Sequence, residues 1–242
     1  MLKDYQDAHG REIYDYLNGK GGYEIVERDD GYVDASGGAK DYFAEYKDWP
    51  PQQKKAIQYA RGRVLDIGCG AGRCLLYLQQ KGLNVMGIDI SPLAIKVCKR
   101  RGVQNVRVMS ITQVSSKLGI FDTIIMFGNN FGLFANRDRA RLLLKRFHKI
   151  TSEKARIIAE SCDPYQTNMP EHLQYHKLNR KRGRMSGQVR IRVRYKKYVT
   201  PWFNYLLVSK NEMADILKDT GWRIKQFFNS TDSFYTVVIG KE

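Results

Sequence analysis

The sequence predicts an α/β fold in which one sheet of mostly parallel strands carries helices on both faces. From residue 63 onward, short apolar runs typical of buried strands alternate with segments whose apolar residues recur at helical spacing. Helices that connect successive strands make those strands parallel and cover both faces of the sheet. Alternating glycines directly after the first apolar run place a strand-to-helix turn at residues 68–72.

The predicted elements follow one another along the chain. The start of one helix is the clearest boundary, because Ser91 can cap it and Pro92 fits its first turn. After residue 209 we expect an amphipathic helix over 210–221 and two closing strands. The expected strands are 63–67, 84–89, 104–109, 121–127, 155–160, 222–228 and 233–239, and the other helices are 72–81, 92–101 and 136–150.

The stretch around the glycines carries the clearest functional signal. Asp66 lies in the first strand, and Gly68, Gly70 and Gly72 follow at every second position. Glycine has no Cβ, so such a turn can adopt positive φ and lets a ligand lie directly on the backbone. Asp89 ends the second strand, where a carboxylate can accept hydrogen bonds from both hydroxyls of a ribose. A dinucleotide fingerprint would need a glycine at position 73, and a carboxylate at 66 would repel a pyrophosphate but could hold a cationic amino group.

These residues resemble the first two motifs of the class I S-adenosylmethionine-dependent methyltransferases, whose fold is Rossmann-like. The resemblance implies a seven-stranded sheet with an antiparallel last strand, and S-adenosyl-L-methionine as cofactor with S-adenosyl-L-homocysteine as product. It implies that Asp66 and the glycine backbone hold the methionine part, that Asp89 holds the ribose, and that Ser110 borders the adenine between apolar side chains. The predicted cofactor-binding residues are Asp66, Gly68, Cys69, Gly70, Gly72, Asp89, Ile90, Ser110, Ile111 and Phe127. The alternative, a glycine turn that only packs helix against strand, leaves both carboxylates unexplained.

Residues 1–59 precede this core and are rich in tyrosine. We interpret them as a lid that closes over cofactor and acceptor, with Tyr42 and Trp49 bordering the acceptor. Arg11 to Leu17 could form a short helix. The alternative is that the aromatic side chains simply pack this segment onto the core.

The fourth strand ends in two asparagines, Asn129 and Asn130, placed among glycines and phenylalanines. The run resembles the Gly-Asn-x-Phe segment of glycine-type N-methyltransferases, which implies that both asparagines border the methyl acceptor. It lacks the Asn/Asp-Pro-Pro-aromatic signature of enzymes that methylate exocyclic nucleobase amines. In the alternative interpretation the asparagines only cap the turn through left-handed geometry.

The sequence does not assign a general base. His172 and His176 would share one helix face and are weak candidates, because imidazole titrates near neutrality. No third ligand accompanies them, so we expect no metal site. A pair of surface histidines is the alternative.

Length and composition indicate one globular domain with an insertion. The 242 residues hold four cysteines without a C-x-x-C pair, which favours reduced thiols over disulfides or zinc. The chain has no apolar stretch long enough to span a bilayer and no signal-peptide pattern at its start, so we expect a cytoplasmic protein, monomer or homodimer, without a membrane partner.

The net charge of +16 is concentrated in one segment. Residues 177–197 contain ten Lys and Arg and no acid, and over 189–196 apolar residues alternate with cationic ones. This period of two predicts a strand, with 202–209 as its antiparallel partner. The cationic face has three possible roles: the solvated face of an edge strand, a wall that recognises an anionic substrate through residues such as Arg192, or an RNA-binding patch.

We therefore predict an N-terminal lid at 1–59 and a methyltransferase domain at 60–242, with a basic β-rich insertion at about 166–209. The predicted function is N- or O-methyl transfer from S-adenosyl-L-methionine to a small molecule, and an anionic acceptor is one alternative for it. The alternatives are a tRNA or rRNA methyltransferase that uses the basic insertion, and a non-catalytic nucleotide-binding protein. One fold carries many acceptors, so the sequence does not identify the substrate.

Overall fold

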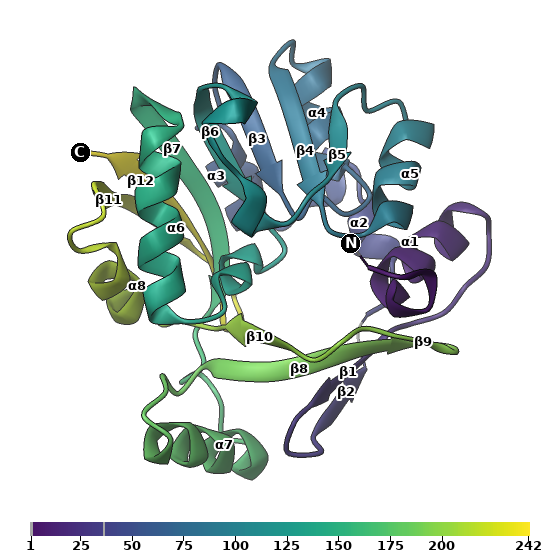
Figure 1. The fold of residues 1–242 in the computed structure, drawn as a ribbon, viewed down its shortest axis with the longest axis vertical. Helices are drawn as coiled ribbons and strands as arrows, with labels where there is room; N and C mark the ends of the chain where they lie inside the picture. The colour runs from purple at the N-terminus through teal and green to yellow at the C-terminus, as the bar shows by residue number, and fades with distance from the viewer. Residues whose placement is uncertain (1, 36) are drawn as a thin grey trace. The chain divides into compact units, whose positions relative to one another are not determined.

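The structure is a computed structural model that describes residues 2–35 and 37–242. Its helices and strands are labelled in Figure 1. The helices are α1 (Ala8–Leu17), α2 (Lys40–Phe43), α3 (Pro51–Ile57), α4 (Arg73–Gln80), α5 (Pro92–Arg100), α6 (Arg137–Lys149), α7 (Pro170–Lys181) and α8 (Lys210–Leu217). The strands are β1 (Ile25–Arg28), β2 (Val33–Ala35), β3 (Arg63–Ile67), β4 (Asn84–Asp89), β5 (Val106–Val108), β6 (Phe121–Met126), β7 (Thr151–Cys162), β8 (Gln188–Tyr195), β9 (Tyr198–Val199), β10 (Phe203–Leu206), β11 (Trp222–Asn229) and β12 (Phe234–Lys241).

The larger sheet confirms the predicted α/β fold. Its seven strands run in the order β11-β12-β7-β6-β3-β4-β5. The pairs β3–β4, β4–β5 and β6–β7 are parallel, whereas β12 is antiparallel to both β7 and β11. Strand β3 shows why the apolar runs were informative, because Val64, Leu65 and Ile67 are all at most 1% exposed. A strand with both faces covered has no polar alternation to display.

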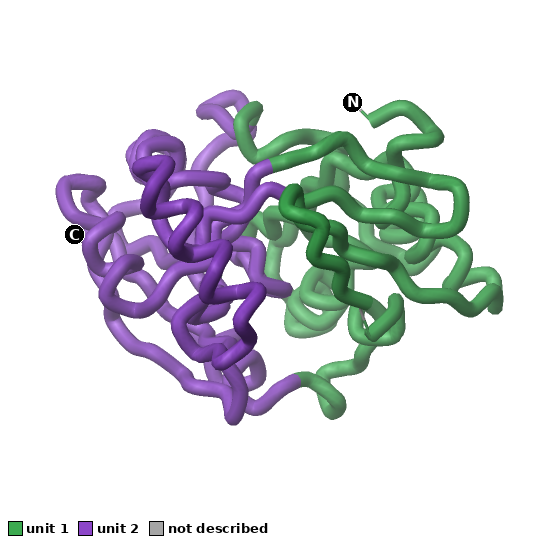
Figure 2. Tube along the Cα trace, turned by 90° about the horizontal axis from the view of Figure 1, so that it is seen from below, with its two compact units in different colours: residues 1–49, 61–113, 191–203 green, residues 50–60, 114–190, 204–242 purple. Residues whose placement is uncertain are grey.

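The chain divides into two compact units, shown in different colours in Figure 2. Unit 1 comprises residues 1–49, 61–113 and 191–203, and unit 2 comprises residues 50–60, 114–190 and 204–242. The predicted lid at 1–59 and the predicted insertion at about 166–209 each contain residues of both units, and both stay predictions.

Within unit 1, the N-terminal segment packs closely against the core. Helix α1 begins at Ala8, three residues before the predicted start, because Asp7 caps it by accepting a hydrogen bond from the Gly10 N–H (3.1 Å). The other oxygen of Asp7 accepts hydrogen bonds from the Ser91 hydroxyl (2.9 Å) and the Leu93 N–H (3.1 Å). A single buried carboxylate thereby joins the starts of α1 and α5.

The smaller sheet contains strands that the sequence did not predict. Its order is β10-β8-β1-β2, with β9 also paired to β8, and β1 pairs antiparallel with both β2 and β8. The predicted alternation in β8 is confirmed, since Val193 and Tyr195 are buried while Arg190 is exposed. Of the three roles considered for the cationic face, that of an edge strand is excluded, because β8 lies between β10 and β1 in the sheet.

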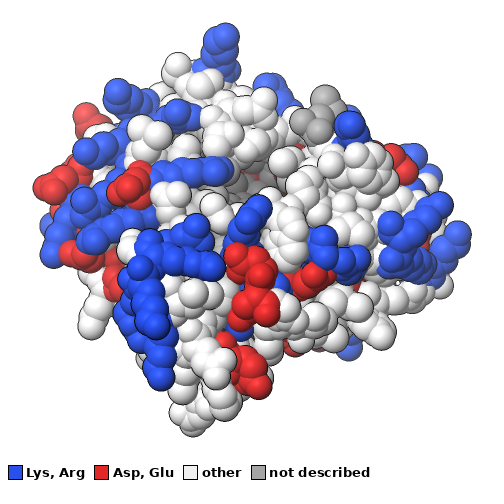
Figure 3. All heavy atoms as spheres, turned by 60° about the horizontal axis from the view of Figure 1, so that its bottom comes forward, with Lys and Arg blue, Asp and Glu red and all other residues white. Residues whose placement is uncertain are grey.

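Charge is spread over the surface as well as concentrated in the basic segment. Lys and Arg side chains cover much of the face shown in Figure 3, with Asp and Glu side chains among them. None of the helices in the described part of the chain is long and apolar enough to cross a membrane.

Candidate functional site

The glycine turn after β3 has the backbone geometry that the sequence predicts. Gly68, Gly70 and Gly72 have φ values of 73°, 52° and 80°, in the left-handed region that favours glycine. The N–H groups of Gly68 and Cys69 donate hydrogen bonds to the Ile88 carbonyl at 2.9 and 3.1 Å, which fixes the turn to the end of β4. The turn therefore presents bare backbone at the carboxyl ends of two parallel strands, where open α/β sheets bind ligands.

Asp89 lies beside this turn with its carboxylate held by backbone groups. One oxygen accepts from the Gly70 N–H (3.0 Å) and the other from the Ser91 N–H (2.9 Å). A carboxylate oxygen can accept two hydrogen bonds, so each retains capacity for a sugar hydroxyl. Burial raises the pKa of Asp89, and the two N–H groups and His9 oppose that rise.

Asp66 is the second buried carboxylate, at 3% exposure. Burial raises its pKa to about 7; the Arg73 guanidinium opposes this rise and the Asp89 carboxylate adds to it. A buried acid without a bound cation is costly to ionise, and a cationic ligand group would stabilise its charged form. Asp66 and Asp89 thus form an anionic pair suited to an ammonium group and a diol.

The remaining predicted cofactor-binding residues of unit 1 differ in their environments. Ile90 is 47% exposed and Ile111 is 7% exposed, while the Ser110 hydroxyl lies 3.0 Å from the Thr112 hydroxyl. Cys69 is buried with its Sγ 4.0 Å from that of Cys98, and the Cys98 thiol together with burial raises its pKa. The Cys69 thiol is therefore protonated, and it is a buried part of the glycine turn.

The N-terminal aromatic residues divide into two groups. A Cβ added to Gly70 would lie 3.3 Å from the Tyr42 ring, so Tyr42 covers the glycine turn. Trp49 is 2% exposed and packs against Tyr77, with the Arg73 guanidinium 4.9 Å from its ring. The geometry of Trp49 matches the packing alternative, whereas Tyr42 lies where a lid residue would.

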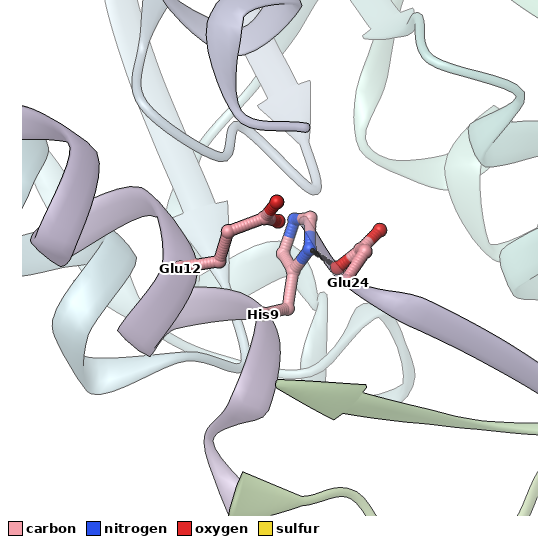
Figure 4. Close-up of side chains that lie close together, drawn as sticks. All are labelled: His9, Glu12 and Glu24. Atoms are coloured by element: carbon pink, nitrogen blue, oxygen red, sulfur yellow. Dashed lines mark hydrogen bonds and ion pairs between the residues drawn. The ribbon is translucent and has the colours of Figure 1, made fainter. Parts of the chain in front are cut away.

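Three ionisable residues beside Tyr42 were missed by the sequence analysis. His9 packs edge-on against the Tyr42 ring (4.8 Å between centroids), and its Nδ1 lies 2.9 Å from Glu24 Oε2. Figure 4 shows the Glu12 carboxylate on the other side of the same imidazole. The Glu24 carboxylate outweighs the effect of burial and raises the pKa of His9 to about 9. The missed signal was the N-cap Asp7, since a helix that begins there places His9 and Glu12 one turn apart on the same face.

In unit 2, the predicted asparagines form a tightly held turn. Asn129 is in the left-handed region (φ 62°), and its N–H donates to Glu160 (3.2 Å) as the Gly128 N–H does (2.7 Å). The Tyr205 hydroxyl donates to the Asn129 carbonyl at 2.6 Å. The left-handed cap is therefore present, and it leaves the side chain of Asn129 available for another role. Phe127 before the turn is buried, and Asn130 begins a 3-10 helix, Asn130–Phe134.

The two candidate histidines lie on α7, as predicted, and each has its own neighbour. His172 Nδ1 is 2.9 Å from the Thr167 hydroxyl, and His176 packs against the Tyr165 ring at 5.8 Å. Their role as general base stays a prediction.

Arg192 is engaged within the protein. Its guanidinium donates two hydrogen bonds to Glu27 (2.8 and 2.7 Å) and lies 4.6 Å from the Trp202 ring. Arg194 donates to the same carboxylate at 2.6 Å. These two guanidinium groups hold the pKa of Glu27 at about 2. A substrate anion would compete with Glu27 for Arg192.

Part of the chain is similar in sequence to known methyltransferases. Residues 64–153 match a family model described as a methyltransferase domain. The chain is 25% identical over 130 residues to a putative methyltransferase of Geobacillus sp., which covers 50% of this chain and 53% of that protein. It is 37% identical over 83 residues to the 2-heptyl-1-hydroxyquinolin-4(1H)-one methyltransferase of Mycobacteroides abscessus (31% of this chain, 37% of that protein). It is also 28% identical over 127 residues to ribosomal RNA small subunit methyltransferase C of Pasteurella multocida (49% of this chain, 39% of that protein).

The chain thus spans about half or less of the length of these curated relatives. A solved structure matches along the whole chain: a SAM-dependent methyltransferase from Bacteroides fragilis in complex with S-adenosyl-L-homocysteine. The TM-score is 0.84 at 24% identity, with 100% of this chain and 97% of that chain covered. This likeness shows that the two proteins share a fold.

Proposed function

Because this chain belongs to the class I S-adenosylmethionine-dependent methyltransferases, we propose that it transfers the cofactor's methyl group to a nitrogen or oxygen atom of a small molecule. The observation that carries the proposal is the pair of buried carboxylates, Asp66 and Asp89, on either side of a turn with three left-handed glycines. This arrangement offers one site for a cation, one for a diol and bare backbone between them.

The proposed roles follow from the chemistry of each group. Asp66 neutralises the amino group of the methionine part, and the backbone at Gly68 and Gly70 contacts its chain. Asp89 accepts hydrogen bonds from the ribose hydroxyls while the backbone N–H groups keep its carboxylate oriented. Ile111 and Ile90 border the adenine.

The acceptor side of the proposal rests on positioning. The sulfonium supplies an already activated methyl group, so much of the rate can come from aligning nucleophile, methyl carbon and sulfur. Tyr42 covers the turn, which supports a water-excluding role for the N-terminal segment. Asn129 and Asn130 are the proposed acceptor-bordering groups.

A small molecule is favoured over RNA because part of the basic strand is neutralised internally. Glu27 pairs with Arg192 and Arg194, and Asp15 pairs with Lys196 at 2.7 Å. The curated relatives include one protein named for a hydroxyquinolone and another named for ribosomal RNA, so RNA is retained as the second candidate.

The test is methyl transfer from radiolabelled S-adenosyl-L-methionine to a panel of small amines, phenols and carboxylates, with total RNA in parallel. We expect label in a small-molecule product and none in RNA. Calorimetry with S-adenosyl-L-homocysteine should show binding that Asp89→Asn weakens at least about tenfold, since two hydroxyls lose a charged acceptor.

The matched control is Asp41→Asn, an exposed carboxylate in the same N-terminal unit, which should leave binding unchanged. Label in RNA alone would replace the small-molecule proposal with the RNA one. No cofactor binding at millimolar concentration would favour the non-catalytic alternative.

A further inference from the structure

The cluster of His9, Glu12 and Glu24 in unit 1 lies outside the groups assigned to cofactor or acceptor. Each of the three residues offers one ligand atom, and these three atoms all lie within 4.8 Å of one another. Ligand atoms about 2.1 Å from a tetrahedral ion are roughly 3.4 Å apart, so small side-chain adjustments would bring this set to bonding distance. Nδ1 of His9 and Oε2 of Glu24, at 2.9 Å, are already that close.

Glu12 supplies the independent observation that a ligand belongs here. Its side chain is 1% exposed, and neither carboxylate oxygen has a hydrogen-bond partner of normal geometry among the described residues, although Glu24 and His9 lie close enough to act on its charge. Figure 4 shows this carboxylate directed toward the imidazole of His9, between α1 and the segment that carries Glu24. An unsatisfied buried carboxylate costs free energy unless a cation or donor meets it.

We propose that His9, Glu12 and Glu24 bind a divalent first-row transition metal ion. One imidazole and two carboxylates are the donors used by zinc, manganese and iron in proteins. Three protein ligands leave at least one coordination position open, as in catalytic rather than structural zinc sites. Metal binding requires the neutral imidazole, so the ion would displace the proton that the neighbouring carboxylates hold on His9.

The position of the cluster gives the ion a possible use in the same unit. His9 contacts Tyr42, and Tyr42 covers Gly70 in the glycine turn. An ion at the cluster would thereby fix α1, the segment before β1 and Tyr42 relative to one another. The metal site does not depend on which acceptor the protein methylates, and its test needs no turnover.

The experiment is calorimetric titration of the metal-stripped full chain with ZnCl₂ and, separately, MnCl₂, together with melting temperatures over the same concentrations. We expect one ion per chain, and a melting temperature that rises with ion concentration. Losing a residue that only orients a metal ligand lowers metal affinity about 10- to 100-fold. Glu12→Gln and His9→Gln should each lower it by more than this, because each removes a ligand.

Two variants control for binding elsewhere. Glu45→Gln removes an exposed carboxylate of the same unit, and His172→Gln removes a histidine of α7; both should bind the ion as the unchanged protein does. Circular dichroism checks that each variant is folded, and Co²⁺ substitution provides a second readout, because bound Co²⁺ gives visible absorption bands that the Glu12 variant should lose or shift.

Three outcomes would overturn the proposal. These are no binding at millimolar Zn²⁺ or Mn²⁺, binding that Glu12→Gln and His9→Gln leave unchanged, and equal losses in the two control variants. If neither ion binds, protonated His9 alone neutralises the charge of the two carboxylates.

Discussion

At the scale of single residues, Asp66 shows a conflict between stability and binding. The residue is 3% exposed, and the Arg73 guanidinium offsets only part of the cost of ionising it. Its pKa is therefore raised from the usual range to about 7. An acid with a raised folded-state pKa adds stability below its unfolded pKa, and this contribution is lost as pH rises through the folded value.

We expect Asp66→Asn to raise the free energy of unfolding at pH 8 by about 1–3 kcal/mol in the absence of cofactor, and to have little effect below pH 4. The same variant should bind S-adenosyl-L-homocysteine more weakly at pH 8. Binding by the unchanged protein should weaken between pH 8 and pH 6, as Asp66 takes up a proton. Urea unfolding and calorimetry at both pH values measure these effects; equal stabilities at pH 8 would contradict the account.

Gly72 tests why the turn requires glycine. Its φ is 80°, and an added Cβ would lie 2.9 Å from Cys98 Sγ and 3.0 Å from Val103. We expect Gly72→Ala to cost about 2–5 kcal/mol, through backbone strain of about 1–2 kcal/mol plus crowding of about 1–3 kcal/mol. The control is Gly82→Ala, where φ is 78° and nothing lies within 4 Å of the added atom, so only strain applies. Chemical denaturation of both variants separates the two contributions, and equal losses would argue against crowding at Gly72.

At the scale of elements, the pairing of β1 with β8 is supported by charge as well as by backbone hydrogen bonds. Glu27 on β1 lies opposite Arg192 on β8 and bonds to both Arg192 and Arg194. The pKa of Glu27 is lowered to about 2, so its contribution is present above the unfolded value and is lost as pH falls toward 2.

We expect Glu27→Gln to lower the melting temperature at pH 7, because the two neighbouring guanidinium groups of β8 then lose their shared counter-charge on β1. The difference from the unchanged protein should shrink as pH falls from 4.5 toward 2. Thermal unfolding across this pH range measures the effect, and a difference that stays constant with pH would rule out the ion pairs as its source.

Elements whose signals are local were predictable, and those that depend on distant partners were not. The strand β3, the glycine turn and the Ser91 cap follow from adjacent residues, and the structure has them where the sequence placed them. Strands β1 and β2 have only four and three residues, and all of β2 is exposed, so their own sequence does not distinguish them from a loop. The alternation of apolar and cationic residues predicts β8 itself, but no local pattern indicates that β1 pairs with it.

The candidate site divides in the same way. Asp66, Asp89 and the glycines form a motif with fixed spacing, whereas Glu24 reaches His9 only through the path of the intervening chain. The tertiary fold also decides that Trp49 is packed while Tyr42 covers the turn. Side-chain packing of this kind leaves no periodic trace in a sequence.

At the scale of the whole molecule, the net charge of +16 predicts attraction to polyanions of any sequence. Ion pairs with Glu27 and Asp15 reduce the share of this charge that the basic strand can offer. Weak, non-specific attraction is therefore expected even if the substrate is a small molecule.

We expect unstructured RNA to bind at 50 mM salt and to lose at least about tenfold in affinity by 200 mM salt, since binding driven by phosphate contacts releases counterions. No methyl label should enter that RNA. Fluorescence anisotropy at several salt concentrations measures the binding; tight, salt-insensitive association with one RNA would contradict non-specific attraction.

The pairing of β1 with β8 has a consequence for how the protein is made. Glu27 leaves the ribosome long before its partner Arg192, which lies 165 residues later. Until then the early hairpin has no neighbour on that side, and exposed strand edges of this kind invite mispairing with other chains. Glu27 lacks its two guanidinium partners until β8 is made, so the charge that supports this pairing is complete only late in synthesis.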